Sequence, residues 1–216
     1  MSLTIHGIVA SRAVRPLWAA AELGLPFEHL PTPYKDGATR TPEFLALNPN
    51  GHIPVLVDHR PDGDVVVWES MACTLYVARH HGRGDGSDIA PASAAEDADA
   101  LRWSFWTVTE LEKDALTVLM HRVAMPADQR KPELAESAEK RLHVPLRVLE
   151  QHLQHQQARG QTHLAADRFT VADLCVASVL NWARAADHVL TSYPLTHAWL
   201  HACVSRPALA QLRAKA

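Results

Sequence analysis

Hydrophobic positions in the first eighty residues change between short apolar runs and helical spacing. Apolar runs of strand length occupy residues 3–9, 27–30, 53–57 and 65–68. Between the first two runs, Ser11 precedes apolar residues at helical spacing over residues 13–23, and Gly24 closes the segment. This order predicts a strand, a helix and a second strand, joined as a parallel crossover unit.

The third and fourth apolar runs are separated by a turn signal, Pro61-Asp62-Gly63. They therefore predict an antiparallel hairpin. A helix is expected over residues 70–80, and a short helical turn over 42–47 within a proline-rich loop. Together these elements predict an α/β sandwich around a mixed four-stranded sheet.

Strand signals almost vanish in the second half of the chain. Helical spacing runs over residues 93–121 and 132–159, the latter with Pro145 inside it, and a third helix begins within "RFTVADLCVAS". Thr170 and Asp173 predict a capping box at the start of that helix. Two short helices are expected after Pro194, separated near residues 205–207. With "GRGDGS" as a break, we predict an α/β domain over 1–81, a linker over 82–92 and an all-α domain over 93–216.

Composition excludes several classes of function. Of 216 residues, 47% are hydrophobic and 21% charged, and the net charge of -3 offers no basic surface for nucleic acid or an anionic membrane. No apolar run approaches the length of a membrane span, and the N-terminus lacks the pattern of a secretory signal. Three scattered cysteines give no disulfide framework, so we expect a reducing, cytoplasmic setting.

Metal binding is considered because histidine is abundant, at 14 residues. His197 and His201 have the i, i+4 spacing of a chelating pair. No HExxH motif and no third ligand at meaningful spacing accompany them. We therefore expect no functional metal site.

Three motifs occur in order along the chain: "NPNGHIPVLVD" at 48–58, "WES" at 68–70 and "RFTVADLCVAS" at 168–178. With the predicted domain order, they resemble the cytosolic glutathione S-transferases over essentially the whole chain. The resemblance implies a thioredoxin-like N-terminal domain, an all-α C-terminal domain, a homodimer and glutathione as co-substrate. It is nearest to bacterial-type members that carry serine at the catalytic position.

The resemblance implies a glutathione site in the hairpin region. The Ile53-Pro54 bond is expected to be cis, with the Ile53 backbone pairing to the peptide's cysteine; without the resemblance, a trans proline at an edge strand would be the simpler reading. Glu69 is expected to pair with the γ-glutamyl ammonium, and Ser70 to bind its carboxylate at a helix N-terminus. His52 is a further candidate contact. For the glycine carboxylate, Lys35 and Arg40 remain alternatives.

The same resemblance places the catalytic position after the first strand. Ser11 is the only hydroxyl candidate in "IVASRAVRPLW", which has no cysteine. A hydroxyl that donates to sulfur stabilises a thiolate and lowers its pKa from about 8.5. The alternative is that Ser11 only caps the helix. Serine cannot form a mixed disulfide, so conjugation is favoured over thiol-disulfide chemistry, and the Ser-Ser-Cys signature of maleylacetoacetate isomerases is absent.

A pocket for a small hydrophobic electrophile is implied beside Ala10 and Arg12 and along the helix that carries "LRWSFWTVTELE". On that helix Trp103, Trp106 and Glu110 are expected to share one face with Thr107, although packing between domains or subunits would explain the tryptophans equally well. Two rival functions stay open. One is a non-catalytic glutathione-binding or ligand-binding protein of the same fold, and the other is a specialised glutathione-dependent lyase, dehalogenase or isomerase.

Overall fold

A computed structural model describes residues 2–215 of the chain. The described residues divide into two compact units. Residues 2–92 and 206–215 form the first unit, and residues 93–205 form the second. The predicted all-α domain ran to residue 216, whereas the structure groups the last helix with the α/β unit.

The first unit is built on a mixed sheet, as predicted. In the described chain β1 (Ser2–His6), β2 (Phe27–Leu30), β3 (Val55–His59) and β4 (Val65–Trp68) form a four-stranded sheet in the order β2-β1-β3-β4. β1 pairs in parallel with β2 and antiparallel with β3, and β3 pairs antiparallel with β4. The first apolar run was expected to reach residue 9, but β1 ends before Gly7, whose φ of 128° suits glycine.

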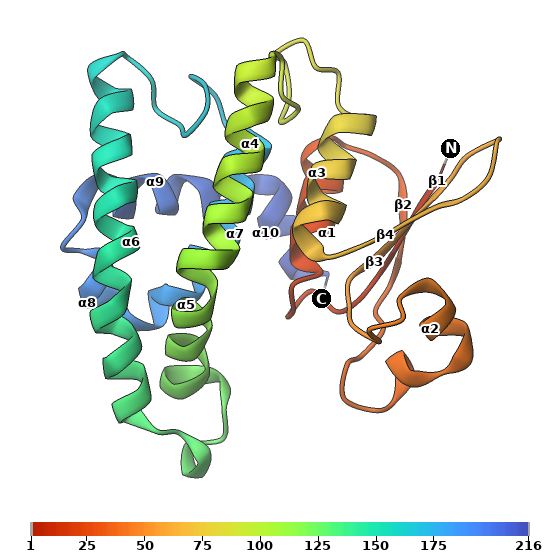
Figure 1. The fold of residues 1–216 in the computed structure, drawn as a ribbon, viewed down its shortest axis with the longest axis horizontal. Helices are drawn as coiled ribbons and strands as arrows, with labels where there is room; N and C mark the ends of the chain where they lie inside the picture. The colour runs from red at the N-terminus through yellow and green to blue at the C-terminus, as the bar shows by residue number, and fades with distance from the viewer. Residues whose placement is uncertain (1, 216) are drawn as a thin grey trace. The chain divides into compact units, whose positions relative to one another are not determined.

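Helices cover both faces of this sheet (Figure 1). α1 (Val14–Glu22) and α3 (Ser70–His81) pack against each other. On the opposite face, α2 (Pro42–Leu47) places Phe44 in a cluster with Val55 and Val57. These two valines share a face because side chains alternate along a strand.

The last helix, α10 (Pro207–Ala214), packs against α1 within the first unit. Arg206 fastens its start, because Nε and Nη2 donate to the two carboxylate oxygens of Glu22 at 2.8 and 2.7 Å. The Glu22 side chain is only 5% exposed, and the indole of Trp18 donates to the same carboxylate at 2.8 Å. A buried carboxylate on α1, which accepts two of its three hydrogen bonds from Arg206, therefore explains why this C-terminal segment joins the α/β unit.

The second unit is entirely helical in the part of the chain that the structure describes. It contains α4 (Ala94–Trp106), α5 (Glu112–Leu119), α6 (Pro132–Ala158), α7 (Val171–Leu180), α8 (Asp187–Leu190) and α9 (Pro194–Val204). Two π-helical segments, Thr107–Leu111 and Met120–Ala124, interrupt the run that was predicted as one helix. Every residue of α7 is buried, so this helix is the centre of the unit.

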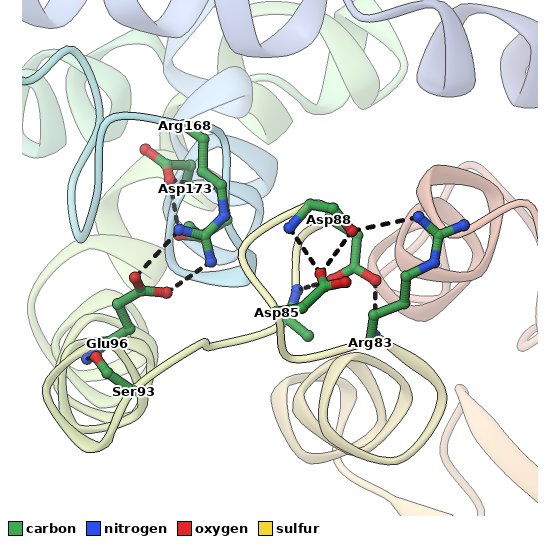
Figure 2. Close-up of polar contacts among 10 residues, drawn as sticks. Arg83, Asp85, Asp88, Ser93, Glu96, Arg168 and Asp173 are labelled. Carbon is green, nitrogen blue, oxygen red and sulfur yellow. Dashed lines mark hydrogen bonds and ion pairs between the residues drawn. The ribbon is translucent and has the colours of Figure 1, made fainter.

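The start of α7 is fixed by the predicted capping box. The buried Asp173 carboxylate accepts from the backbone and hydroxyl of Thr170, both at 2.9 Å. It also accepts from Leu164 N and from the Trp199 indole, at 2.9 and 3.0 Å. Close by, Figure 2 shows Arg168 donating to both oxygens of Glu96 on α4. Asp173 thus joins the loop at Leu164, the start of α7 and Trp199 of α9.

The predicted linker, residues 82–92, is an ordered loop of the first unit. Asp88 accepts hydrogen bonds from the backbone N–H groups of Arg83 and Ala90, at 2.7 and 2.8 Å (Figure 2). A Cβ at Gly82 would lie 2.4 Å from the Ala90 side chain, so glycine is required there for space. Within the described residues, none of the helices has the length and hydropathy needed to cross a bilayer.

Candidate active site

Ser11 lies in the turn between β1, an interior strand of the sheet, and α1. The Ser11 hydroxyl donates to the carbonyl of Ile8 at 2.7 Å and accepts from the backbone N–H of Ala13 at 3.1 Å. Ser11 was expected to cap the helix directly, but the N-cap is Ala13, which makes no side-chain capping bond. Ser11 therefore closes the turn that leads into α1, and its single proton points at Ile8.

The loop before β3 meets this turn at Gly7. The Ile53-Pro54 peptide bond is cis, as predicted. A Cβ built on Gly7 would lie 2.7 Å from the Cβ of Ala13 and 3.1 Å from the Cβ of Ile53. Only glycine fits between them, so Gly7 permits the Ser11 turn and the cis-proline loop to approach each other closely.

Glu69 and Ser70 lie where β4 passes into α3. Glu69 is exposed and is the one non-glycine residue with positive φ, 70°, in the described chain. Such a backbone costs on the order of 1–3 kcal/mol and persists where the surrounding structure holds it, commonly at binding sites. Ser70 is the first residue of α3, and its hydroxyl accepts a hydrogen bond from the Arg15 guanidinium at 2.8 Å.

Of the two candidates for the glycine carboxylate, the structure brings Arg40 to this region. Its Nη1 donates to the Asn50 carbonyl at 3.1 Å, and it covers Gly51, immediately before the cis-proline loop. Lys35 is exposed, and its ammonium lies over the ring of Tyr34 at 5.7 Å. His52 is exposed, and its carbonyl accepts from the Asn48 side chain at 2.8 Å. The guanidinium of Arg40 is thus held beside the loop that leads into the cis proline.

The residues predicted for the electrophile pocket differ in their exposure. Ala10 and Arg12 are exposed in the first unit. In the second, Trp103 is 5% exposed and stacks edge-on against His152, with ring centroids 4.8 Å apart. Trp106 is half-buried and Glu110 exposed. The shared face expected for these residues assumed a regular α-helix, but the π-helical segment begins at Thr107 and changes the spacing.

Burial is the largest cause of the pKa shifts of three groups on or near the elements described above. Burial raises the pKa of the Cys73 thiol on α3 to about 12, so this thiol stays protonated. Burial also lowers the pKa of His6 at the end of β1, with Glu28 acting in the opposite direction. In the second unit, burial lowers the pKa of His152, which packs against Trp103. Among the described residues, no cluster of three or more histidine, cysteine or acidic side chains could hold a metal ion.

Two residues that the sequence did not single out shape this site. Gly7 separates the Ser11 turn from Ile53, and its signal was a glycine directly after an apolar strand. Arg15 is 1% exposed within the apolar face of α1 and reaches Ser70, which lies 55 positions away in the sequence. A charged residue among apolar helix positions is the one sequence signal that could have indicated it.

Comparison with known proteins agrees with this architecture. The family models for the N-terminal and C-terminal domains of glutathione S-transferase match residues 1–79 and 113–207. Glutathione S-transferase 3 of Zea mays is 34% identical over 95% of this chain and 90% of its own length. Glutathione S-transferase GstB of Escherichia coli strain K12 is 27% identical over 87% of this chain and 86% of its own.

Solved structures show the same similarity. Glutathione S-transferase III in its apo form superposes with a TM-score of 0.80 at 32% identity, covering 99% of this chain and 96% of the other. Glutathione S-transferase-I bound with lactoylglutathione gives a TM-score of 0.82 at 25% identity, covering 98% of each chain. By its sequence, its two family domains and its fold, the chain belongs to the glutathione S-transferase family.

Proposed function

We propose that this protein is a glutathione transferase, in which the glutathione thiolate attacks a small hydrophobic electrophile. The observation that carries the proposal is the meeting of three segments of the first unit. The cis Ile53-Pro54 loop, the Glu69-Ser70 junction and the Ser11 turn are linked through Gly7 and Arg15. The names of the relatives support the activity.

Each end of glutathione has a complementary group in this site. Glu69 carries the negative charge that would pair with the γ-glutamyl ammonium, and Ser70 starts a twelve-residue helix whose N-terminus favours a carboxylate. The Ile53 backbone would pair with the cysteine residue in the manner of an added strand. Arg40 is better placed than Lys35 for the glycine carboxylate, and His52 is a neighbouring contact. Glutathione serves as co-substrate, and no metal takes part in this proposal.

Ser11 is proposed to support the thiolate by donating a hydrogen bond from its hydroxyl to sulfur. The hydroxyl donates to Ile8 O at 2.7 Å, so it must rotate when glutathione binds. The exchange replaces a neutral acceptor with an anion, and hydrogen bonds to ions are roughly twice as strong as neutral ones. The lone pair that accepts from Ala13 N can stay engaged during this rotation, because a hydroxyl has two acceptor positions.

The test is a pH titration of bound glutathione, followed by thiolate absorbance, for wild type, Ser11→Ala and Ser11→Thr. The proposal expects a thiol pKa below about 8.5 in wild type. Ser11→Ala should lose that shift, and Ser11→Thr, which keeps a hydroxyl, should retain part of it. If wild type binds glutathione with an unshifted thiol, the non-catalytic binding function is the better description and Ser11 serves only to close its turn.

We propose Ala10 and Arg12 in the first unit, and Trp106 and Glu110 in the second, as candidate contacts for the electrophile. Trp103 has a packing role against His152, so it is a weaker candidate for substrate contact than Trp106. Conjugation is favoured over disulfide chemistry because Ser11 cannot form a mixed disulfide. A panel of aryl halides, epoxides and haloalkanes separates general conjugation from a specialised lyase, dehalogenase or isomerase.

We also propose that the protein forms a homodimer in the cytoplasm. Exposed apolar side chains support an interface in each unit: Val66 and Trp68 lie on the edge strand β4, and Phe105 and Val108 lie at the end of α4 and just beyond it. Phe105 is the most exposed of them, at 66%. Light scattering should give twice the 23.8 kDa chain mass, and Phe105→Ser should shift the mass toward the monomer.

A further inference from the structure

We propose that Arg15 is a positioning residue that aims the hydroxyl proton of Ser70 at the γ-glutamyl carboxylate of glutathione. The inference rests on the proposed function, which supplies the ligand. It deepens that function by adding a group that does not touch the ligand itself. The observation behind it is the hydrogen bond from Arg15 Nη1 to Ser70 Oγ, 2.8 Å long, between two buried residues.

The geometry determines where the Ser70 proton can point. A serine hydroxyl has one proton and two acceptor positions. Because a guanidinium is only a donor, it occupies an acceptor position of Ser70 Oγ and directs the hydroxyl proton away from itself. No residue between 2 and 215 accepts that proton in a hydrogen bond. The proton therefore remains available to a ligand at the start of α3.

The charge of Arg15 acts in the same direction. A guanidinium remains protonated inside proteins, so α1 carries a fixed positive charge one hydrogen bond behind Ser70. Arg15 is 1% exposed and Ser70 5% exposed, so water screens this charge far less than it would at the surface. A carboxylate that accepts from Ser70 would meet a hydroxyl already polarised by a cation, which strengthens the hydrogen bond.

A purely structural role for Arg15 would make a different prediction. The same hydrogen bond ties α1 to α3, and its loss could loosen both helices. Loosening would weaken every ligand of the site to a similar degree. Aiming the proton of Ser70 matters only for a ligand that carries the carboxylate, so the two roles differ in ligand discrimination.

The test compares two peptides by calorimetry: glutathione and 4-aminobutyryl-Cys-Gly. The second peptide keeps the terminal ammonium and the thiol but lacks the γ-glutamyl carboxylate. Wild type should prefer glutathione by about 10- to 100-fold, the range expected for a hydrogen bond to a charged group. Arg15→Met, which keeps an unbranched apolar stem but removes the guanidinium, should lose about tenfold or more of that preference, with little change for the analogue.

Control variants separate the possible outcomes. Arg79→Met removes an exposed arginine from α3 and should keep the wild-type preference. Ser70→Ala should lose the preference as Arg15→Met does, and the double variant should lose little more, because Arg15 acts through Ser70. Circular dichroism verifies the fold of each variant, and if Arg15→Met does not fold, Arg15→Gln, which is polar but uncharged, takes its place with the same expected loss of preference.

Three results would overturn the inference. Equal weakening of both peptides by Arg15→Met would assign Arg15 a structural role only. If Ser70→Ala kept the wild-type preference for glutathione, the Ser70 hydroxyl would not be the group that binds the carboxylate. If wild type did not bind glutathione at all, the proposed function would be wrong and the inference would fall with it. The first two results are distinct from this one, because in both of them wild type binds glutathione.

Discussion

Asp58, near the end of β3 in the first unit, holds a buried charge whose contribution to stability can be measured. Its side chain is 0% exposed on β3. The oxygen Oδ2 accepts from Arg60 Nε at 2.7 Å, from the Tyr76 hydroxyl at 2.9 Å and from His81 Nε2 at 3.0 Å. The other oxygen, Oδ1, is buried with no hydrogen-bond partner in the described chain. The substitution Asp58→Asn removes the charge while keeping the size.

The cost of Asp58→Asn follows from these contacts. An asparagine can place its one carbonyl oxygen at the Oδ2 position, but its amide group then lies at Oδ1, where no acceptor is present. Hydrogen bonds to a charged group contribute about 1.5–3 kcal/mol each, and Arg60, 26% exposed, can recover part of its loss from water. We therefore expect the free energy of unfolding to fall by about 2–3 kcal/mol, and the melting temperature by about 4–12 °C.

The difference between wild type and Asp58→Asn should depend on pH. Burial raises the pKa of Asp58, but the hydrogen bonds from Arg60, Tyr76 and His81 outweigh burial and hold that pKa below its ordinary value. A carboxyl with a lowered pKa in the folded state stabilises the fold above its unfolded value, and loses that effect as pH falls toward the folded value. The wild-type advantage should be constant from pH 7 to about pH 5 and shrink below about pH 4.

Urea unfolding, followed by tryptophan fluorescence and circular dichroism between pH 3 and 7, measures this difference. The matched control is Asp64→Asn on the same hairpin. Its carboxylate is 54% exposed and pairs with a His59 side chain that is 42% exposed, so we expect a change below about 0.5 kcal/mol. An Asp58→Asn protein as stable as the Asp64→Asn control at pH 7 would refute the reasoning.

Four further predictions concern other parts of the described chain. Glu69→Gly relieves the positive φ of 70° and should leave stability unchanged or raised by about 1 kcal/mol, while glutathione affinity measured by calorimetry falls; a clear loss of stability would contradict the strain argument. Cys73, with its pKa raised to about 12, should stay unreactive toward an aromatic disulfide reagent at pH 8 until the protein unfolds. Asp173→Ala removes four hydrogen bonds at the start of α7 and should lower stability in urea by about 4 kcal/mol; a loss below about 1 kcal/mol would count against the capping box. Arg206→Met leaves the Glu22 carboxylate buried without its guanidinium and should lower the melting temperature, whereas Arg213→Met, an exposed change on α10, should not.

Elements with strong local signals were predictable from the sequence. The strands at 27–30 and 65–68 and the helix at 42–47 have the predicted bounds, because prolines, a glycine and apolar runs mark their ends. The parallel and antiparallel pairings were also correct, since chain connectivity restricts them. The capping box at Thr170 was readable because both of its partners lie within three residues.

Features that depend on distant residues were not predictable in this way. Arg15 and Ser70 lie 55 positions apart, and the π-helical segment at Thr107 reflects packing that local propensity does not encode. The proton direction of Ser11 also escaped prediction, because the Ile8 carbonyl that receives it belongs to an irregular turn. The candidate residues of the first unit could be named from sequence motifs, but their mutual contacts required the fold.

The return of α10 to the first unit bears on the order in which the chain acquires structure during synthesis. Glu22 and Arg206 are separated by 184 positions. At a translation rate of roughly 5–20 residues per second, α1 leaves the ribosome about 10–40 s before the helix that covers it. During that interval the Glu22 carboxylate and the indole of Trp18 lack the partner that encloses them in the finished protein. A fragment ending at residue 92 would keep α1 in that uncovered state permanently, so the α/β unit is completed only once residues 206–215 have been made.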